Sequence, residues 1–409
     1  MSDEIVAIDR DTSKSASPRL ITILTIGVGV LVANLYYAQP LVASIAPEIG
    51  VSRDIAGSIV SVTQIGYGTG LFFLVPIADL VENRRLVLTL LGLTILGLLG
   101  VATSISVGVF FVASFLIGVC ATGAQVLLPF VAHLVPEVRR GRVTGKVMAG
   151  VLTGIMLARP AALFIAASFG WRAVFLASAG LLLVIGVLLA RMMPAYRPAG
   201  GLHYGRIITT MVRLPARMPD LCWRSVYGAL MFGAFNMFWT AAPLMLADRF
   251  RLGQHAIGLF ALAGAGGALA APWAGRLSDG GREIAATFGA MILMTISFIG
   301  CLWAAKAAML PALAICALLI DAAVQTNSVV SRRTVFGTAP AIRGRVNALY
   351  MTTQFAGGAA GSIIGTLSYH WGGWTGTAWT GACAGFLLLM LLACELVSQR
   401  RRIRLDRLN

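Results

Sequence analysis

Apolar stretches of membrane-spanning length recur along almost the whole chain. Hydrophobic residues make up 58% of the 409 residues and charged residues only 12%, which is too little charge for the surface of a soluble protein of this length. Each stretch is long enough to cross a bilayer as a helix. The sequence therefore predicts an all-α membrane protein with twelve transmembrane helices, at Leu20–Ala43, Ile55–Ala78, Leu86–Ser104, Val107–Ala132, Val147–Phe169, Ala173–Ala190, Ser225–Ala247, Ala256–Ala274, Ile284–Ala305, Met309–Ser331, Val346–Ser368 and Thr375–Cys394.

The basic residues are distributed unevenly between the two sides of these predicted spans. Of the 32 Lys and Arg residues, 26 fall in the termini and in the connections that follow an even-numbered span. Five fall in the connections that follow an odd-numbered span, and Arg159 lies inside the fifth span. The positive-inside rule then predicts that both termini are cytoplasmic. Because loop charge accounts for the net charge of +16, we expect the lipid bilayer and not nucleic acid as a partner. The Arg401–Arg407 run is interpreted as a membrane-proximal tail.

The two halves of the sequence repeat one another at a spacing of 200 to 203 residues. Asn34 in "NLYYAQPL" corresponds to Asn236 in "NMFWTAAPL", and "RGRVTG" from Arg140 corresponds to "RGRVNA" from Arg343. Six spans per half is an even number, so the halves are predicted to be parallel repeats. The predicted parts are a cytoplasmic tail (1–19), a six-helix bundle (20–190), a cytoplasmic linker (191–224), a second six-helix bundle (225–397) and a basic cytoplasmic tail (398–409).

Several segments resemble the major facilitator superfamily, among them "NLYYAQPLVASIAPEIGVS" from Asn34, "GIMLARP" from Gly154 and "LLIDAAVQTNSVVSRR" from Leu318. The resemblance covers essentially the whole chain and is closest to bacterial efflux-type members, the arabinose-efflux-permease-like and purine-nucleoside-efflux-like group. It implies the major facilitator fold, a monomer in the cell inner membrane, and transport of a small molecule by alternating access.

The superfamily signature between the second and third spans is only partly present. In "VPIADLVENRR", Asp79, Arg84 and Arg85 match it, while Val75 and Leu80 replace a glycine and an arginine. The second half has the more complete form. The resemblance therefore implies cytoplasmic gate residues in both halves: Asp79, Arg84, Arg85, Gly275, Asp279 and Arg282.

Two formal charges fall well inside predicted spans, Arg159 in the fifth and Asp321 in the tenth. A charge at that depth costs about 2.5–3.5 kcal/mol on insertion scales, so such residues face a cavity or each other. One interpretation is a structural ion pair that locks the halves together. The other is a pair that lines the substrate path and couples protons to transport, with Asp321 as the proton carrier. In the resembling family these spans lie at the seam between the halves, so we expect the two side chains to meet there.

Further polar side chains lie on the helices that line the cavity in the resembling family. Interhelical hydrogen bonding alone could explain each of them. Their presence on corresponding helices of both halves favours a binding pocket for a neutral or weakly charged organic solute. The predicted pocket residues are Asn34, Tyr37, Gln39, Gln64, Tyr67, Gln125, Asn236, Trp239, Gln325 and Gln354.

Enzyme motifs are missing from the sequence. It contains no HExxH and no Walker A motif, and its four histidines lack metal-ligand spacing, so we expect neither an enzyme nor a cofactor or metal. Without an ATP site, uphill transport must draw on an ion gradient. The leading hypothesis is a proton antiporter that exports small organic compounds. A proton symporter for nutrient uptake is the alternative, and a transport-inactive receptor or scaffold is an alternative of another class.

Overall fold

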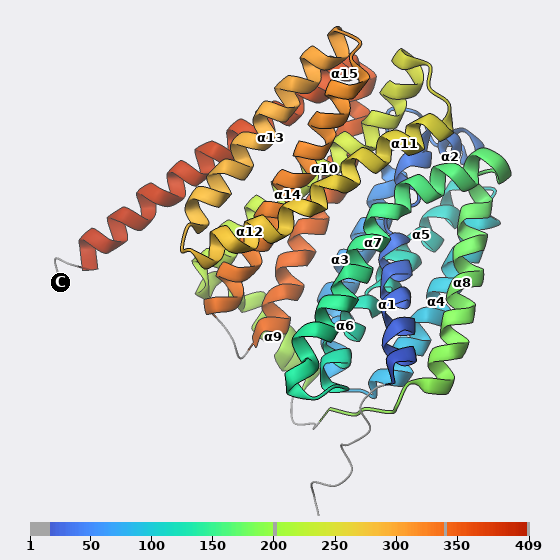
Figure 1. Ribbon diagram of the computed structural model, residues 1–409, viewed down its shortest axis with the longest axis vertical. Coiled ribbons are helices and arrows are strands. Elements are labelled where there is room, and N and C mark those ends of the chain that lie inside the picture. The colour runs from blue at the N-terminus through green and yellow to red at the C-terminus, as the bar shows by residue number, and fades with distance from the viewer. Residues whose placement is uncertain (1–16, 199–202, 339–341, 407–409) are drawn as a thin grey trace, which may run out of the picture.

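The computed structural model describes residues 17–198, 203–338 and 342–406, and within these ranges every regular element is a helix. Figure 1 shows two helical bundles side by side, one from each half of the sequence. The first contains α1 (Pro18–Ala33), η1 (Gln39–Leu41), α2 (Val42–Ile49), α3 (Ser58–Phe73), η2 (Val75–Asp79), α4 (Asn83–Ala102), α5 (Val107–Ala121), α6 (Gly123–His133), α7 (Glu137–Phe169) and α8 (Trp171–Met192).

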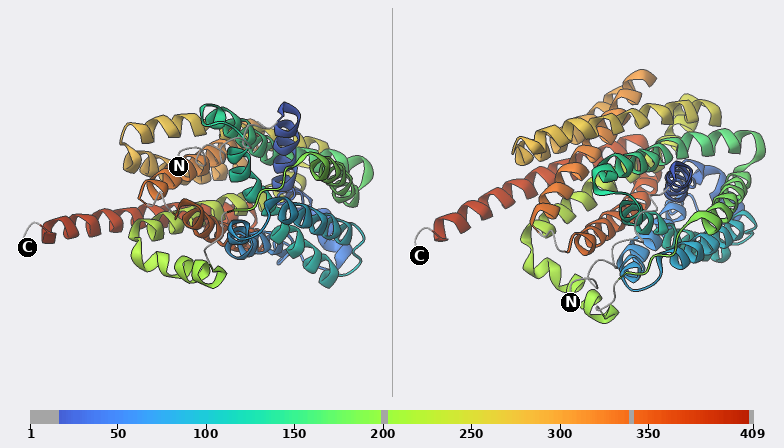
Figure 2. Two further views of the ribbon diagram at one scale, coloured as in Figure 1. Left: turned by 90° about the horizontal axis from the view of Figure 1, so that it is seen from below. Right: turned by 60° about the horizontal axis from the view of Figure 1, so that its bottom comes forward.

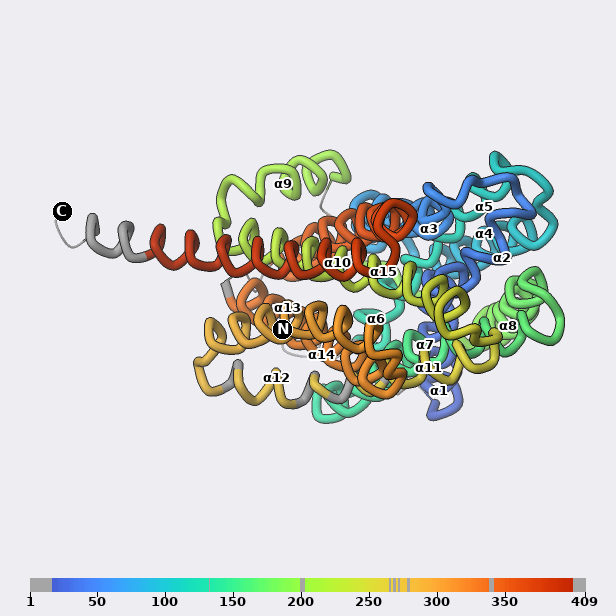
Figure 3. Tube along the Cα trace, turned by 90° about the horizontal axis from the view of Figure 1, so that it is seen from above, coloured from blue at the N-terminus to red at the C-terminus, as the bar shows by residue number. Residues whose placement is uncertain are grey.

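The second bundle follows a helix in the connecting segment, α9 (Tyr204–Arg217). It contains α10 (Pro219–Phe250), α11 (Gln254–Ala265), η3 (Gly266–Leu269), α12 (Ala270–Asp279), α13 (Glu283–Lys306), α14 (Leu310–Thr338) and α15 (Arg343–Asp406). The two bundles also lie side by side in the views of Figures 2 and 3, where the last turns of α15 extend beyond them. Helix α10 begins six residues before the predicted seventh span.

Nine segments of the described residues are long and apolar enough to cross a membrane as single helices. The twelve predicted spans differ from these nine because of three local breaks. The first span stops at Ala33 and resumes as η1 and α2, and the eighth is interrupted by η3. The eleventh and twelfth form one assigned helix, although Gly373, with φ of 55° and ψ of −156°, divides it. Pro40 in η1 lacks an amide proton to continue a helix, and Gly373 adopts a positive φ that glycine tolerates at little cost.

The two bundles close against each other at the end of the molecule that holds α2. There α3 packs on α15, where the Ser61 hydroxyl donates to the Ala359 carbonyl at 2.6 Å and the Gly57 amide to Thr366 Oγ1 at 3.1 Å. Gly57 has no room for a side chain, because a Cβ there would overlap the Ser362 carbonyl. Backbones in such close contact exclude solvent, so this end is sealed.

The opposite end holds the first turn of α1, the helix α9 and the last turn of α14, and is called the basic end below. Helix α9 bridges the two bundles here. Its buried side chains Ile207 and Met211 pack in one cluster with Ala348 of α15 and with Leu80 of the first bundle. The Tyr204 hydroxyl donates to the Phe73 carbonyl at 2.9 Å. The connecting segment is thus an ordered contact between the halves over its helical part.

Candidate functional site

A cavity of about 530 Å³ lies between the two bundles. Its wall combines residues of α1, α3, α6 and α7 from the first bundle with residues of α10, α11, α14 and α15 from the second. The cavity reaches the basic end, where Asp79, Arg343 and Arg345 line it, and its deep end is lined by Tyr36, Arg159 and Asp321. A solute entering from the basic end would therefore meet both deep charges before the sealed end.

Arg159 is held at the deep end of the cavity by aromatic rings. Its guanidinium carbon lies 4.7 Å from the ring centroid of Trp239, 5.0 Å from that of Phe235 and 5.1 Å from that of Tyr36. The Nε atom donates to Oε1 of Gln39 at 2.9 Å. The side chain is buried, with 5% of its surface exposed, and its Nη2 has no hydrogen-bond partner. The stacked rings stabilise the cation but leave donor capacity unused.

Asp321 lies at the edge of the same indole. The Nε1 of Trp239 donates to Oδ1 of Asp321 at 2.7 Å, and no described residue donates to Oδ2. Asp321 is 8% exposed. Two glycines allow the close approach of α11 and η3: a Cβ on Gly264 would overlap the Trp239 indole, and one on Gly267 would overlap Cβ of Asp321. The hydrogen-bonded pair of Trp239 and Asp321 can therefore occupy this position only because both neighbouring residues are glycines.

The structure brings Arg159 and Asp321 to one site but does not pair them directly. Among the described residues, no carboxylate forms an ion pair with Arg159. Trp239 contacts both charges, with its face toward Arg159 and its Nε1 toward Asp321. The expected direct ion pair is absent in this conformation, in which one indole interacts with both groups.

Buried amides connect the two halves beside Arg159. Nε2 of Gln39 donates to Oδ1 of Asn236 at 3.0 Å, and Nε2 of Gln64 donates to the same oxygen at 2.6 Å. Nδ2 of Asn236 donates to the Phe232 carbonyl at 2.9 Å. The Gln39 side chain accepts from Arg159 through its oxygen and donates to Asn236 through its nitrogen, so it links Arg159 to the second bundle. This network therefore depends both on the cation and on the packing of the two halves.

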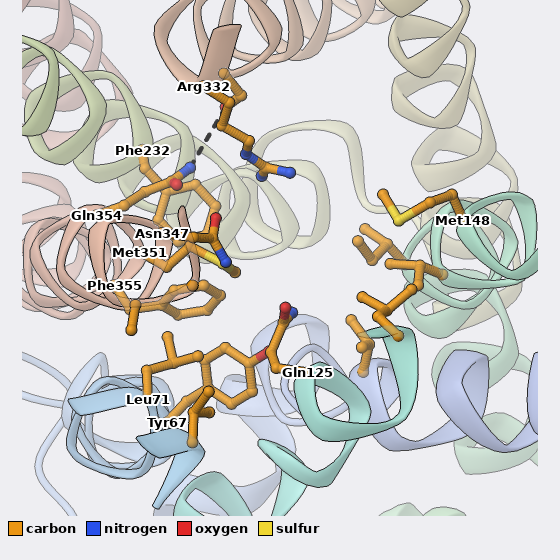
Figure 4. A pocket seen from close by; sticks show the side chains of 18 of the residues that line it. Tyr67, Leu71, Gln125, Met148, Phe232, Arg332, Asn347, Met351, Gln354 and Phe355 are labelled. Atoms are coloured by element: carbon orange, nitrogen blue, oxygen red, sulfur yellow. Dashed lines mark hydrogen bonds between the residues drawn. The ribbon is translucent and has the colours of Figure 1, made fainter. Parts of the chain in front are cut away.

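Four of the predicted pocket residues line the cavity: Tyr67, Gln125, Gln325 and Gln354. Nε2 of Gln125 donates to the Tyr67 hydroxyl at 3.1 Å, and Nε2 of Gln354 to Oγ of Ser328 at 3.5 Å. Figure 4 shows Gln125, Arg332 and Asn347 pointing into the cavity from different helices, with the rings of Tyr67, Phe232 and Phe355 on one side. The wall is thus mixed, with amides and a guanidinium on an aromatic background.

Comparisons with known proteins identify the family. The sequence profile described as Major Facilitator Superfamily matches residues 24–329 and again residues 225–406. The chain belongs to the Major Facilitator Superfamily. It is 36% identical over 376 residues to "Uncharacterized transporter YgaY" of Escherichia coli O157:H7, covering 92% of this chain and 95% of that one. It is 33% identical over 381 residues to "Probable transporter SCO4007" of Streptomyces coelicolor, covering 91% and 85%.

A solved structure shows the same fold at low sequence identity. A bacterial homolog of the human lysosomal transporter Spinster, in an inward-facing and unoccupied conformation, aligns with a TM-score of 0.72 at 11% identity over 93% of this chain and 96% of that one. This major facilitator protein is therefore a multi-pass membrane transporter and not an enzyme. The predicted membership and fold are confirmed, and the described residues hold no cluster of ligands for a metal ion.

Six predicted pocket residues do not line the cavity of this major facilitator protein. Four of them, Gln39, Gln64, Asn236 and Trp239, belong to the buried contacts around Arg159 and Asp321 described above. The other two, Asn34 and Tyr37, lie elsewhere in the first bundle. Asn34 is buried inside the first bundle, where Nδ2 donates to the Val30 carbonyl at 2.8 Å and Oδ1 accepts from Ser178 at 2.8 Å. Tyr37 lies on the outer groove between α1 and α7. Its neighbour Tyr36 contributes to the cavity instead. The helix ends at Ala33, so the 3.6-residue period no longer predicts which side chain faces inward.

The predicted gate residues do not form one cluster. Of these residues, Asp79 lines the cavity mouth. Arg84 donates to the Ala190 carbonyl, and the exposed Arg85 pairs with Glu82 at 3.0 Å. In the second half, the Gly275 carbonyl accepts from Arg333 at 3.0 Å, and Arg282 is exposed before α13. The side chain of Asp279 lies outside the described residues. The gating roles stay predictions.

Sequence reasoning passed over several residues that the cavity contains. Phe232 and Phe235 carry no polar group that would single them out among the apolar residues of a span. Asn347 lies in the "RGRVNA" segment, which indicates the repeat of the two halves but not a pocket residue. Arg332, in contrast, is predicted from the sequence to share one helical face with Asp321, eleven residues before it, and it lines the cavity. A search for aromatic residues at helical spacing from Trp239 would have found Phe232 and Phe235, seven and four residues before it.

A single methyl group at position 264 should test the arrangement without changing any charge. In the Gly264→Ala variant the new Cβ would overlap the Trp239 indole and lie 3.2 Å from Oδ2 of Asp321. We expect transport per folded protein to fall about tenfold or more, because small misplacements at a site have large kinetic effects. Gly289→Ala in α13 is the matched control, since a Cβ there meets nothing within 4 Å. Equal rates in both variants would contradict a functional role for the Trp239 position.

Proposed function

We propose that this transporter exports small organic compounds by proton antiport, through alternating access, in the cell inner membrane. One observation carries the proposal: a single deep carboxylate, Asp321, shares an interbundle cavity with a buried cation, and one indole couples the two. Ionisable residues at such depth are retained at substrate and proton pathways. The cavity has the mixed apolar and polar lining expected of a small-molecule site.

The proposed orientation follows from the charge distribution. Of the 32 basic residues, 26 belong to the connections and termini at the basic end, which the positive-inside rule assigns to the cytoplasm. With that orientation the cavity is open to the cytoplasm and sealed toward the outside. The structure would then represent an inward-facing state, ready to take a compound from the cytoplasm. Rocking of one bundle against the other would open the sealed end.

Labelling from outside the cell tests this orientation. On a background without the six native cysteines, Gly205→Cys places a thiol on the exposed side of α9, and Gly253→Cys places one in the exposed turn between α10 and α11. A membrane-impermeant maleimide should label position 253, and not 205, in intact cells. Inverted vesicles should show the opposite pattern. Labelling of position 205 in intact cells would reverse the proposed topology.

The coupling follows from competition for one oxygen. Oδ2 of Asp321 accepts no hydrogen bond from a described residue, so it is available to a proton or to a donor group of the substrate. If both bind there, each displaces the other, and exchange of one for the other on opposite sides of the membrane is antiport. A proton moving inward down its gradient would then drive the compound outward.

One observation favours the symport alternative. The unpartnered Nη2 of Arg159 can bind an anionic group, and an anion alone would bind better when Asp321 is protonated and neutral. Proton and anion would then travel together.

The resemblance to efflux-type proteins, through segments such as "GIMLARP" from Gly154, supports export. In the structure the glycines of this region pack closely on α1, with a Cβ on Gly150 only 2.6 Å from the Thr25 carbonyl, which explains their small size by packing.

Transport in inverted vesicles decides between the two directions. Vesicles with an acidic interior, made from bacterial cells that express the wild type or Asp321→Asn, would be incubated with a metabolite extract and their contents measured by mass spectrometry. A proton antiporter should accumulate at least one compound only with the wild type and only while the pH gradient lasts. Accumulation that occurs only in right-side-out vesicles would establish uptake and overturn the export proposal.

A further inference from the structure

We propose that the substrate is a compact zwitterion with an apolar or aromatic body, whose anionic group binds Arg159 and whose cationic group binds Asp321. The inference rests on the proposed function, because it names the substrate class of the same cavity. It goes beyond that function in requiring both charges on one molecule. The site has two poles of opposite sign, and each retains unused hydrogen-bonding capacity on the described residues.

The positive pole is the guanidinium of Arg159. Its Nε is occupied by Gln39, but Nη2 has no partner, although the side chain is 95% buried. A buried charged donor without a partner is costly. The three surrounding rings attract the cation through their faces but cannot accept a hydrogen bond in the guanidinium plane. A carboxylate in that plane would satisfy the free donors, because its geometry matches the guanidinium fork.

The negative pole is Oδ2 of Asp321. Trp239 Nε1 occupies Oδ1 and fixes the orientation of the carboxylate, while Oδ2 accepts nothing from the described residues. Arg159 does not form an ion pair with it. An ammonium group of a ligand would supply the missing donors and a compensating charge. A proton that binds Oδ2 would displace this ammonium. Proton and ligand would then occupy the same site in turn, which agrees with antiport.

A ligand of a single charge would leave one pole uncompensated. An anion would satisfy Arg159 and bring a like charge near Asp321, and a cation would satisfy Asp321 and bring a like charge near Arg159. Leaving a buried charge without a partner typically costs several kcal/mol. Because both poles contact the same indole, a small molecule with both groups can reach them together.

The remaining wall defines the body of the ligand. Phe232, Phe235 and Phe355 line the cavity, with Phe235 beside Arg159, and the Tyr67 ring lies tilted by 54° against that of Phe355 with ring centroids 4.5 Å apart. A cavity of about 530 Å³ is in the size range of small-molecule sites. Aromatic and aliphatic side chains gain free energy by leaving water for such a wall. The chemistry therefore fits an amino acid-like solute with a large apolar side chain.

Few titratable or charged groups surround Asp321, so the pH dependence of binding can be assigned. Arg159 faces it from α7 and Tyr36 from the segment after α1, while Arg332 lines the same cavity on its own helix, nearer the mouth. From α10 it is faced by Trp239, which does not titrate, and from α11 and η3 by glycines. Protonation of Asp321 should weaken zwitterion binding, whereas it would strengthen binding of a simple anion.

Two matched sets of probes test the proposal by calorimetry on the purified, full-length protein. The first set shares a phenylethyl skeleton: phenylalanine carries both charges, 3-phenylpropanoate only the carboxylate, and 2-phenylethylamine only the ammonium. The second set is leucine, 4-methylpentanoate and 3-methylbutylamine. We expect at least one zwitterion to bind about tenfold or more tightly than both of its singly charged relatives, which corresponds to about 1.4 kcal/mol.

Variants assign the two poles. Arg159→Met should remove the advantage of the carboxylate without weakening the binding of the amine, and Asp321→Asn should remove the advantage of the ammonium without weakening the binding of the acid. Lys306→Met and Glu137→Gln, which are exposed and outside the cavity, are the charge-matched controls. Equal binding of an acid or an amine and its zwitterion, tighter zwitterion binding at acidic pH, or no binding of any probe would overturn the proposal. Proton-driven export of another class of compound in the vesicle assay would then leave the proposed function intact.

Discussion

Asp321→Asn is expected to abolish uphill transport while leaving the protein folded. The amide is close in size to the carboxylate and can still accept the hydrogen bond from Trp239 Nε1, so the local packing should survive. It cannot bind and release a proton in the physiological range, so the pH gradient has no group to act on. Accumulation driven by a pH gradient in reconstituted liposomes should fall to the background of empty liposomes.

Downhill counterflow separates the loss of coupling from the loss of binding in this variant. In counterflow no proton gradient is needed, so Asp321→Asn should retain some exchange if its cavity still closes around the solute. Glu137→Gln removes an exposed carboxylate outside the cavity and should behave as the wild type in both assays. Gradient-driven accumulation by Asp321→Asn at the rate of the wild type would rule out the coupling role.

Arg159→Met is expected to lose transport with little loss of stability. Methionine loses the contacts to three rings and the bond to Gln39, but it also removes a buried charge whose Nη2 has no partner. These contributions oppose one another, and exchanging a buried charge for an apolar side chain is often neutral or stabilising. The apparent melting temperature should therefore stay within about 3 °C of the wild type. Loss of a buried charged contact to substrate, at about 2–4 kcal/mol, lowers affinity by roughly 30- to 1000-fold.

The double variant tests whether the two charges ever pair. In this conformation each charge has its own partners, so neutralising both should not restore what either single variant loses. Arg159→Lys should also fail, because an ammonium lacks the planar fork that stacks on rings and binds carboxylates in two contacts. Recovery of transport in the Arg159→Met/Asp321→Asn double variant would show that a direct ion pair forms elsewhere in the transport cycle.

The sequence alone determined the class of this protein and identified the two charged residues of its candidate site. Apolar runs fix membrane insertion because a helix satisfies its own backbone in lipid, and this holds whatever the neighbouring helices are. The repeat at about 200 residues predicts the two-bundle plan, because each half contains the same number of spans. Arg159 and Asp321 could be found because a charge in an apolar span is costly and therefore informative.

Only the tertiary structure decided how these residues relate to one another. Hydropathy carries no information about which helices are neighbours, so the contacts of Trp239 with both charges, and the contact of Gln39 with Asn236, could not be predicted from the sequence. The break after Ala33 changed the register, so Tyr36 and not Tyr37 reached the cavity. Asn34 and Asn236 match in sequence yet differ in role, because the first bonds within its own bundle and the second across the seam. Lateral packing decides such partners, since a side chain's hydrogen bonds depend on the neighbour that the fold places beside it.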